Sequence, residues 1–551
     1  MNHPQTAKII RNPVLPGFHP DPSILRVGDD YYLANSTFEW CPGVRLHHSR
    51  DLLNWVTVGG ALDEPRLLDL TGCPDSGGVW APNLTYADER FHLVYSNVST
   101  YAGGFTDCPN YVVTAPSIDG PWSDPVLLHA RGFDASLFHD GDESWLLNLV
   151  HDWRPGHGGS AGLEATRFDR RTLSLVGAPA KLALPERAGW IEGPNLYRRG
   201  DWYYLLTADG GTGYGHQVAV ARSRTLQGPY EPDPDGPLIT ARDHPDLSLQ
   251  KAGHGSLVTT PGGKWYLAYL VARPHGRHGP CILGRETALA PVTWTSDEWP
   301  RVPSGLPADV VPAPAQYRDA APPAPRAVAP NQDGFDDPTL GTHWSTLRRH
   351  ASQDWLSLTD RPSHLRLRGG RSPRSALGAS LVARRADAPH CGFEATLDYR
   401  PLGIQHLAGI TAYYNSENWY FLHVTLDDDR RPVLRVAAGD RGRVTLDEPG
   451  QHVLDEGCLS HLKLGLDLAD AALTFRYDAG EGWRAIGAAY DATVLSDEHA
   501  QVIEDGQIRS LGFTGTFLGL WAWDLSGGGH PADFDSASYV RADVTARGIA
   551  R

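Results

Sequence analysis

Five residues of chemical interest share one position in a repeated pattern. Asp21, Asp134 and Glu192 each stand 11 residues before an aromatic residue of a short strand-like run, and Trp80 and His254 stand at the same offset from two further runs. An isolated Asp is ordinarily a turn or capping residue. Unrelated turn residues would not share one offset five times, so we expect these side chains to gather at one place.

The three acids are suited to general acid–base catalysis. Hydrolysis of a glycosidic bond needs one carboxylic acid to protonate the leaving oxygen, and one carboxylate to activate water or attack the anomeric carbon. Asp21 and Glu192 could supply these two groups. Asp134 would keep the pKa of the acid raised through like-charge repulsion and would orient it. The pattern therefore favours cleavage of a sugar linkage.

The other candidates have two interpretations each. His254 is either a buried histidine bonded to a neighbouring carbonyl or a member of the site. Trp80 and Phe38 are either core residues or a platform, because aromatic rings also stack on sugar faces. We keep all three as candidates for substrate binding.

A repeat of about sixty residues positions these side chains. Aromatic strand-like runs occur at 29–36, 90–97, 144–151, 201–208 and 264–271, with steps of 60, 54, 57 and 63 residues between equivalent positions. Polar turns and a further strand follow each run, which is typical of a propeller blade rather than a helical repeat. Because the innermost strand of each blade lines the central channel, we predict a five-bladed β-propeller with the candidate residues around that channel.

The rest of the chain predicts a second domain. Residues 307–332 are dense in Pro and Ala and can neither pair as a central strand nor hold a long helix. Alternating runs beyond them, such as WYFLHVTL and LGLWAWDL, predict an antiparallel β-sandwich of the jelly-roll, concanavalin-like type. We therefore expect an all-β chain with a propeller at 1–306, a linker at 307–332 and a sandwich at 333–551.

Charge and composition exclude several classes of partner. The net charge of -16 over 551 residues opposes binding to nucleic acid and to anionic membranes. No stretch approaches the roughly 18 apolar residues of a membrane span, and the first twenty residues lack the apolar core of a signal peptide. The six cysteines show no C-x-x-C spacing. We expect a cytoplasmic homo-oligomer with reduced thiols that binds an oligosaccharide, and neither nucleic acid nor membrane.

Several segments make the chain resemble glycoside hydrolase family 43. They include HPDPSI around Asp21, VWAPNL around Trp80, GFDASLF around Asp134, IEGPNLY around Glu192 and AGHGSLV around His254. The likeness covers nearly the whole chain, including FTGTFLGLWAWD near its end. It is strongest to the two-domain β-xylosidases and α-L-arabinofuranosidases of that family.

This resemblance implies an activity and a role for each acid. The expected activity is that of an inverting exo-glycosidase, which releases terminal β-D-xylose and/or α-L-arabinofuranose from hemicellulose-derived oligosaccharides. Asp21 would be the general base, Asp134 the pKa modulator and Glu192 the general acid. Asn83 and Asp209 depart from the family pattern, in which many relatives carry an acid and a Glu, and this leaves the preferred sugar open.

The resemblance also implies roles for three further residues. Arg285 would reach a hydroxyl of the terminal sugar or an active-site carboxylate, and Phe513 would close the pocket from the second domain. His254 would lie under the sugar, or near a metal or water in the channel. No cofactor is expected to be required, although a divalent cation such as calcium could occupy the channel. A pocket closed in this way would accept only a chain end.

Two other functions remain open. A non-catalytic carbohydrate-binding propeller would have lost the reaction, but all three acids are present. A retaining fructan-type hydrolase would use Asp21 as nucleophile, usually within an N-D-P-N frame, whereas this chain has H-P-D-P-S. The two mechanisms differ in carboxyl separation, which is roughly 6.5 to 9.5 Å for inversion and about 5 to 5.5 Å for retention. The sandwich could also be an independent sugar-binding module, although Phe513 and the short junction favour a docked domain.

Overall fold

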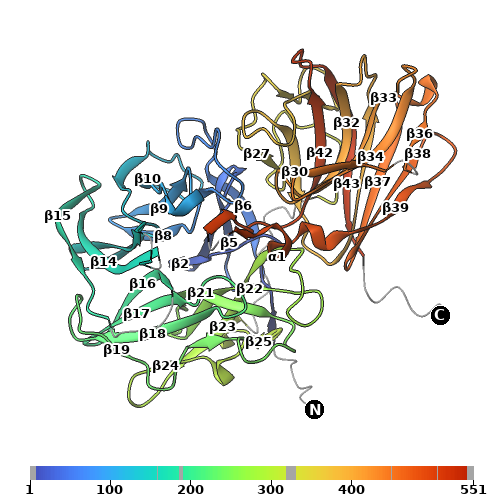
Figure 1. Cartoon of the computed structure of the whole chain (residues 1–551). Coiled ribbons are helices and arrows are strands. Elements are labelled where there is room, and N and C mark those ends of the chain that lie inside the picture. Colours follow the sequence, from blue (N-terminus) through green and yellow to red (C-terminus); the bar gives the residue numbers. More distant parts are fainter. Residues whose placement is uncertain are drawn as a thin grey trace.

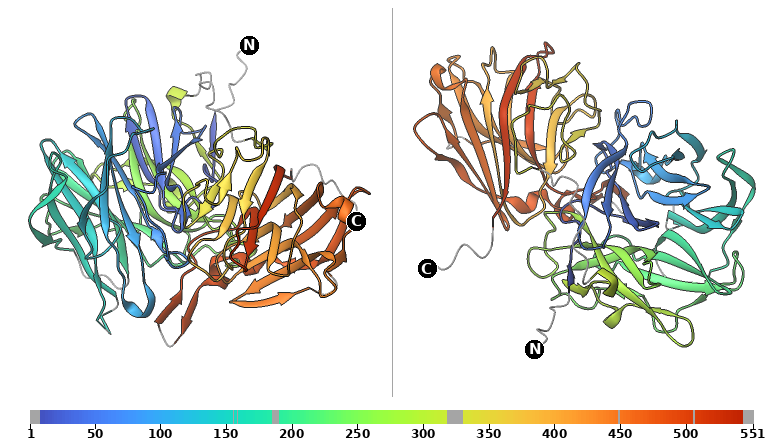
Figure 2. Two further views of the ribbon diagram at one scale, coloured as in Figure 1. Left: turned by 90° about the horizontal axis from the view of Figure 1, so that it is seen from above. Right: turned by 180° about the vertical axis from the view of Figure 1, so that it is seen from behind.

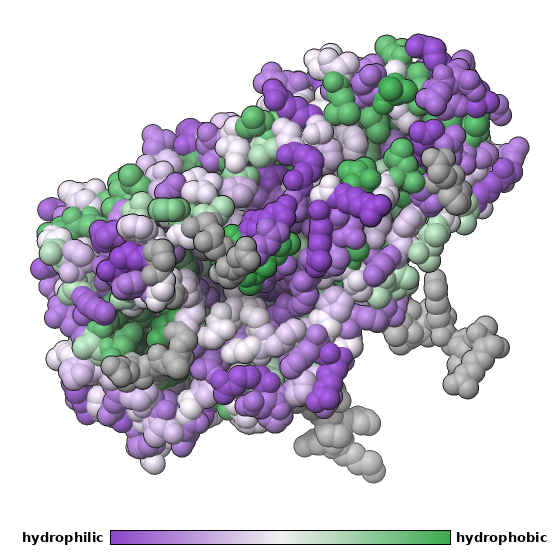
Figure 3. Space-filling model, in the orientation of Figure 1, coloured by the Kyte–Doolittle hydropathy of each residue, from purple (hydrophilic) through white to green (hydrophobic). Residues whose placement is uncertain are grey.

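The computed structural model describes residues 8–154, 156–157, 159–184, 190–317, 330–447, 450–504 and 507–542. The chain is almost entirely β and forms two bodies, a propeller and a sandwich, which lie side by side in Figures 1 and 2. The predicted five-bladed propeller and concanavalin-like sandwich are confirmed. Polar residues dominate the face drawn in Figure 3, where hydrophobic residues form scattered groups.

Five antiparallel sheets of four or five strands form the blades. Blade 1 contains β2 (Ser23–Val27), β3 (Asp30–Asn35), β5 (Gly43–Ser49) and β6 (Val56–Leu62). Blade 2 contains β7 (Gly78–Val79), β8 (Asn83–Ala87), β9 (Arg90–Val98), β10 (Asn110–Ala115) and β11 (Val126–His129). Blade 3 contains β12 (Ser136–Asp140), β13 (Glu143–Asp152), β14 (Gly159–Asp169) and β15 (Ser174–Lys181). Blade 4 contains β16 (Ile191–Arg199), β17 (Trp202–Asp209), β18 (Gln217–Ser223), β19 (Glu231–Pro232) and β20 (Ile239–Thr240). Blade 5 contains β21 (Gln250–Thr259), β22 (Trp265–Ala272), β23 (Arg285–Trp294) and β24 (Pro300–Arg301).

The innermost strands close into a ring. Strand β2 contacts β8, β8 contacts β12, β12 contacts β16, β16 contacts β21, and β21 returns to β2. The predicted aromatic runs are the second strands of the blades, and their apolar residues pack in clusters between one blade and the next. Burial between blades therefore holds the ring together and fixes where each inner strand begins.

The segment predicted as a linker is partly paired. Strand β25 (Val310–Pro312) lies within it and pairs with β1 (Ile9–Arg11) of the N-terminal segment. The next N-terminal residues run beside β23, where the amide of Val14 donates to the carbonyl of Thr287. Residues 318–329 of the predicted linker lie outside the described residues.

The sandwich has two large sheets. The first contains β26 (Gln332–Asp333), β28 (Leu356–Ser357), β29 (Leu365–Arg368), β31 (His390–Asp398), β37 (Leu462–Ala469), β38 (Ala472–Asp478), β39 (Arg484–Asp491) and β43 (Pro531–Arg541). The second contains β27 (Ser345–Leu347), β30 (Ser380–Arg385), β32 (His406–Tyr413), β33 (Trp419–Leu426), β34 (Pro432–Asp440), β35 (Arg443–Leu446), β36 (His452–Val453) and β42 (Phe517–Asp524). One large apolar cluster fills the space between them.

The two domains share secondary structure. Strand β4 (Trp40–Cys41) belongs to the first blade's polypeptide but pairs with β27 at the edge of the second sandwich sheet. The ring of Trp40 stacks on Phe517 with centroids 3.8 Å apart. The hairpin of β40 (Val502–Glu504) and β41 (Gln507–Ser510) reaches from the sandwich to the propeller, together with helix α1 (Asp497–Ala500) (Figure 1). The sandwich is thus docked on the propeller, not tethered beside it.

Helical segments are short throughout the described chain. Besides α1, they are the 3-10 turns η1 (Ala102–Gly104), η2 (Pro303–Gly305), η3 (Ala315–Tyr317), η4 (Glu456–Cys458) and η5 (Ala492–Leu495). Within the described residues, no helix has the length and apolar character needed to cross a membrane.

Candidate active site

The five residues at the shared offset lie where the inner strands begin. Asp21 and Asp134 each stand two residues before an inner strand, β2 and β12. Trp80 precedes β8, whereas Glu192 and His254 lie within β16 and β21. The ring of inner strands therefore brings these five side chains to one end of the channel, as the repeat predicts.

Four predicted site residues have left-handed backbone conformations. The φ angles of Asp21, Phe38, Asp134 and His254 are 51°, 50°, 56° and 47°. Residues with a side chain rarely adopt this region, and each such residue costs on the order of 1–2 kcal/mol. Surrounding contacts must hold these conformations in place, and such residues cluster at functional sites in proteins.

Asp21 is buried and held by two donors. The hydroxyl of Ser36 donates to Oδ2 at 2.6 Å, and Nη1 of Arg285 lies 3.5 Å from Oδ1. A guanidinium and a hydroxyl donor both stabilise a carboxylate. Asp21 is therefore in an environment that supports its negative charge.

The surroundings of Glu192 instead oppose a negative charge on its carboxyl group. Burial raises its pKa to about 7, and the negative charges of Asp21 and Asp209 act in the same direction. The indole Nε1–H of Trp190 donates to its Oε2, and this bond and the charge of Arg285 oppose the rise in pKa. A carboxyl group with a pKa near neutrality can carry a proton to a leaving group at physiological pH.

Asp134 is buried beside the other two acids. Burial, followed by the charges of Glu192 and Asp21, raises the pKa of Asp134 well above its ordinary value. The amide of Gly193 donates to its Oδ2 at 3.1 Å. Gly193 has a φ of 59°, and a Cβ there would lie 3.1 Å from the ring of His254. The close approach of β16 to β21 therefore requires glycine at this position.

Aromatic rings from both domains form a wall beside the acids. Phe38 and Trp80 of the propeller have ring centroids 5.8 Å and 5.9 Å from that of Phe513. Phe513 stands in the loop between β41 and β42, and its amide N–H donates to the hydroxyl oxygen of Ser76 at 3.1 Å. The same Ser76 accepts the indole N–H of Trp80 through its carbonyl at 2.9 Å. One propeller residue thus fixes an aromatic side chain from each domain.

Arg285 connects this wall to the acids. Its Nη2 donates to the carbonyl of Phe513 at 2.8 Å, and Nη1 donates to the hydroxyl of Thr212 at 3.3 Å while facing Asp21. The guanidinium lies 4.8 Å from the ring centroid of Phe513 and 5.5 Å from that of Phe38. Arg285 was expected to contact either a sugar hydroxyl or an active-site carboxylate. The structure shows its contact with the carboxylate of Asp21.

His254 offers one nitrogen ligand at most to a metal. Burial lowers its pKa, which favours the neutral ring that a metal would require. Within the described part of the chain, no three His, Cys, Asp or Glu side chains lie together so as to hold a metal ion.

Three neighbours of the acids were not predicted. Trp190 precedes Glu192 by two residues, and this spacing puts both side chains on one face of an extended chain. Ser36 lies opposite Asp21 if the β2–β3 register of Ser23 with Ala34 is continued outward by two residues. Both signals are readable from a sequence once the hairpin register is known. Phe133, which stacks on Trp190, follows only from the fold.

Comparisons with known proteins agree with this architecture. Residues 10–300 match the model of "Glycosyl hydrolases family 43", and residues 332–540 match the "Beta xylosidase C-terminal Concanavalin A-like domain". The chain is 41% identical over 545 residues to "Xylosidase/arabinosidase 43B" of Humicola insolens, covering 96% of this chain and 97% of that protein. It is 40% identical over 537 residues to the "Beta-xylosidase" of Bacillus subtilis, covering 95% and 98%.

A solved structure is similar over the same extent. The xylan β-1,4-xylosidase from Bacillus halodurans C-125 superposes with a TM-score of 0.91 at 44% identity, covering 96% of this chain and 99% of that one. Both domains are therefore shared with these relatives, in the same order. The chain belongs to glycosyl hydrolase family 43.

Proposed function

We propose that this protein is an inverting exo-glycosidase that releases terminal β-D-xylose and/or α-L-arabinofuranose from hemicellulose-derived oligosaccharides. The observation that carries the proposal is the contrast between two acids of one site. The pKa of Glu192 is raised to about 7, whereas Asp21 contacts a guanidinium and a hydroxyl. The names of the relatives, xylosidase and arabinosidase, support the substrate class.

In this proposal the acids act in one concerted step. Asp21 takes a proton from a water molecule, which attacks the anomeric carbon from the face opposite the leaving group. Glu192 gives its proton to the leaving oxygen as the glycosidic bond breaks. The released sugar then has the opposite anomeric configuration, and proton exchange with solvent restores both carboxyl groups.

Asp134 modulates the acid rather than contacting the leaving group. Because Coulomb repulsion is mutual, an ionised Asp134 opposes ionisation of Glu192 as much as the charge of Glu192 raises the pKa of Asp134. Its bond from Gly193 ties it to the strand that carries the acid. When Asp134 is ionised, it therefore favours the protonated form of Glu192.

The aromatic wall supports action at chain ends. Phe513 contributes a ring from the sandwich to the propeller's Phe38 and Trp80, and its carbonyl is bonded to Arg285. We propose that these groups close one side of the site around a terminal sugar. A linear xylo-oligosaccharide should then yield monosaccharide and a chain one unit shorter as its first products.

The decisive experiment compares two substrates on the purified protein. Hydrolysis of nitrophenyl β-D-xylopyranoside and nitrophenyl α-L-arabinofuranoside should be measurable for at least one, and their kcat/KM ratio defines the preference. Glu192→Gln is the control, with an expected loss of at least about 10²-fold on oligosaccharides. If neither pentoside is hydrolysed, the result would contradict the proposal and favour a non-catalytic sugar-binding propeller.

We further propose that catalysis needs no cofactor, since the acid and the base are both side chains. Dialysis against a chelator should leave kcat unchanged. A loss of activity that calcium restores would instead assign a cation to the channel near His254.

We also propose that the protein is a cytoplasmic homo-oligomer. All six cysteines are unpaired, which fits a reducing compartment. Light scattering should give a mass of at least twice the 60.1 kDa of one chain. A mass equal to that of one chain would contradict the proposal. Cell fractionation tests the compartment.

A further inference from the structure

A cluster of basic side chains is buried where the two domains meet. Arg45 and His47 lie on β5 of the propeller, and Arg385 ends β30 of the sandwich. Their exposed fractions are 2%, 0% and 8%. The ring of His19, just before β2, packs edge-on against His47 with centroids 4.9 Å apart.

Both guanidinium groups are bonded to neutral acceptors. Arg45 donates to the carbonyls of Thr342 at 2.7 Å and Trp344 at 3.2 Å. Arg385 donates through Nε to the carbonyl of Phe18 at 2.7 Å. Both also donate to one atom, the hydroxyl oxygen of Ser345, at 2.7 Å and 3.4 Å. The two cations therefore converge on a single small acceptor.

Arg385 has some aromatic compensation. Its guanidinium lies 5.4 Å from the ring centroid of Phe18 and 5.3 Å from that of Phe517. A ring face attracts a cation but carries no net charge. This contact reduces the cost of burial without balancing the charge.

Three polar atoms of the cluster have no hydrogen-bond partner among the described residues. They are Nε of Arg45, Nη2 of Arg385 and Nε2 of His47. Nδ1 of His47 lies 3.1 Å from the hydroxyl of Thr57. When that hydroxyl donates to Nδ1 of the neutral ring, Nε2 carries the hydrogen. All three orphaned atoms are then donors, which is the pattern required by an anion.

The other buried arginines of the described chain are balanced. Arg285 faces Asp21 and Arg348 contacts Asp75. For Arg45 and Arg385, no described carboxylate forms an ion pair. Arginine does not lose its proton in proteins, and a buried charge without a partner is strongly unfavourable. Two such charges beside each other also repel.

We propose that a halide-sized monovalent anion, chloride in ordinary buffers, binds between Arg45 and Arg385 and stabilises the docking of the two domains. Both domains contribute donors, Arg45 from the propeller and Arg385 from the sandwich. The anion would therefore bind the docked domains and not the separated ones. Because both guanidinium groups are buried and bond the same hydroxyl of Ser345, the proposed ligand is a small ion and not an oligosaccharide or a nucleotide.

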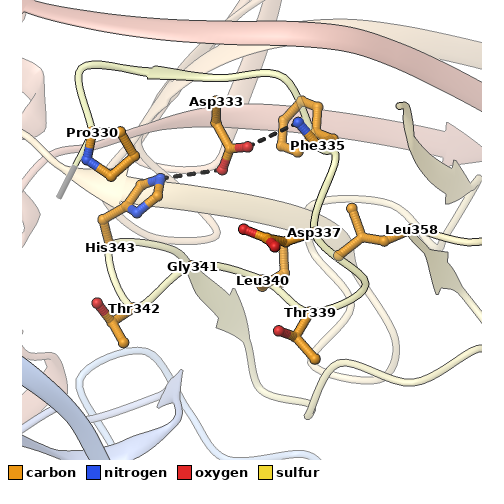
Figure 4. A pocket seen from close by; sticks show the side chains of 10 residues that line it. All are labelled: Pro330, Asp333, Phe335, Asp337, Thr339, Leu340, Gly341, Thr342, His343 and Leu358. Atoms are coloured by element: carbon orange, nitrogen blue, oxygen red, sulfur yellow. Dashed lines mark hydrogen bonds and ion pairs between the residues drawn. The ribbon is translucent and has the colours of Figure 1, made fainter. Parts of the chain in front are cut away.

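A pocket of about 200 Å³ brings solvent close to this cluster. Figure 4 shows Thr342 and His343 at its edge, on the sandwich side. The carbonyl of Thr342 accepts Nη1 of Arg45. One residue that lines the pocket therefore also bonds Arg45.

The first test measures the thermal midpoint of the wild-type protein at constant ionic strength. Sodium methanesulfonate is replaced stepwise by sodium chloride or sodium bromide. A ligand that binds only the native state raises stability with its concentration, and we expect a saturable rise of about 2–4 °C. A midpoint that depends on ionic strength but not on the identity of the anion would overturn the proposal.

The second test removes the donors. In Arg45→Met combined with Arg385→Met, the halide-dependent rise should disappear, whereas Arg66→Met, at an exposed arginine paired with Glu64 and Asp124, should keep it. A rise that persists in the double variant would contradict the assignment.

If that double variant does not fold, bromide-soaked wild-type crystals provide the readout. Anomalous density should lie within hydrogen-bond distance of Nε of Arg45 and Nη2 of Arg385. Density for water alone at this position would overturn the proposal.

Discussion

At the scale of single residues, two carboxyl groups are held in an environment that opposes their ionisation. Burial raises the pKa of Glu192 to about 7 and that of Asp134 well above its ordinary value. A group with a raised native pKa binds more protons in the native than in the unfolded state. Its contribution to stability is therefore present below the unfolded pKa and is lost as the pH rises through the native pKa. The site is optimised for proton transfer at the expense of stability at neutral pH.

Replacing Asp134 by Asn should therefore raise stability and lower activity together. At pH 7 we expect the thermal midpoint to rise by about 2–4 °C, because a neutral amide replaces a carboxyl group whose ionisation the buried site opposes, while kcat falls. The matched change Asp21→Asn should lower the midpoint, since it leaves the guanidinium of Arg285 without its carboxylate. Differential scanning calorimetry measures the thermal midpoints of both variants. A lower midpoint for Asp134→Asn would contradict this, because it would show that the carboxyl group at this position stabilises the native state.

Trp190 provides a direct probe of the acid. Its indole N–H donates to Glu192 and lowers the pKa of that carboxyl. Trp190→Phe keeps an aromatic ring against Phe133 but removes the donor. The alkaline limb of the pH profile of kcat/KM, which reports the acid in the free enzyme, should move to higher pH. An unchanged limb would mean that another group controls it.

At the scale of elements, the shared offset could be predicted because each inner strand forms a hairpin with the aromatic strand after it. The offset alone predicts that Asp21, Asp134 and Glu192 lie together, and the structure places them near one another. The pairing of β4 with β27 could not be predicted, since residues 40 and 345 are far apart in sequence and two-residue strands carry no periodic pattern. Pairing of β25 with β1 was missed for the same reason.

The loop that carries Phe513 gives a prediction at this scale. Phe513→Ala removes one aromatic wall but keeps the backbone groups that bond Arg285 and Ser76. We expect KM for short substrates to rise by about 3- to 10-fold, as for the loss of one aromatic contact, with little change in thermal midpoint.

The matched control lies four residues further along the chain. Phe517 is fully buried and stacks on Trp40, so Phe517→Ala should cost about 3–5 kcal/mol of stability. Unchanged kinetics for Phe513→Ala, or a loss of stability like that of the control, would make Phe513 a core residue.

At the scale of the whole molecule, the sandwich and the propeller behave as one unit around the site. The ammonium of Lys251 in the propeller is buried against Asp497 and Glu498 of the sandwich, at 3.4 Å and 2.5 Å. Arg348 of the sandwich contacts Asp75 of the propeller. The sequence predicted docking from the junction and from Phe513, but not these ion pairs, because nothing local marks which distant charges will meet.

We propose that these two docked domains form an inverting hydrolase. Its most direct test is proton NMR of the sugar first released from a nitrophenyl β-D-xyloside or α-L-arabinofuranoside, recorded before mutarotation. We expect that α-D-xylose or β-L-arabinose appears first and then equilibrates. First release of the anomer present in the substrate would contradict it, since Asp21 would then act as a nucleophile and not as a base.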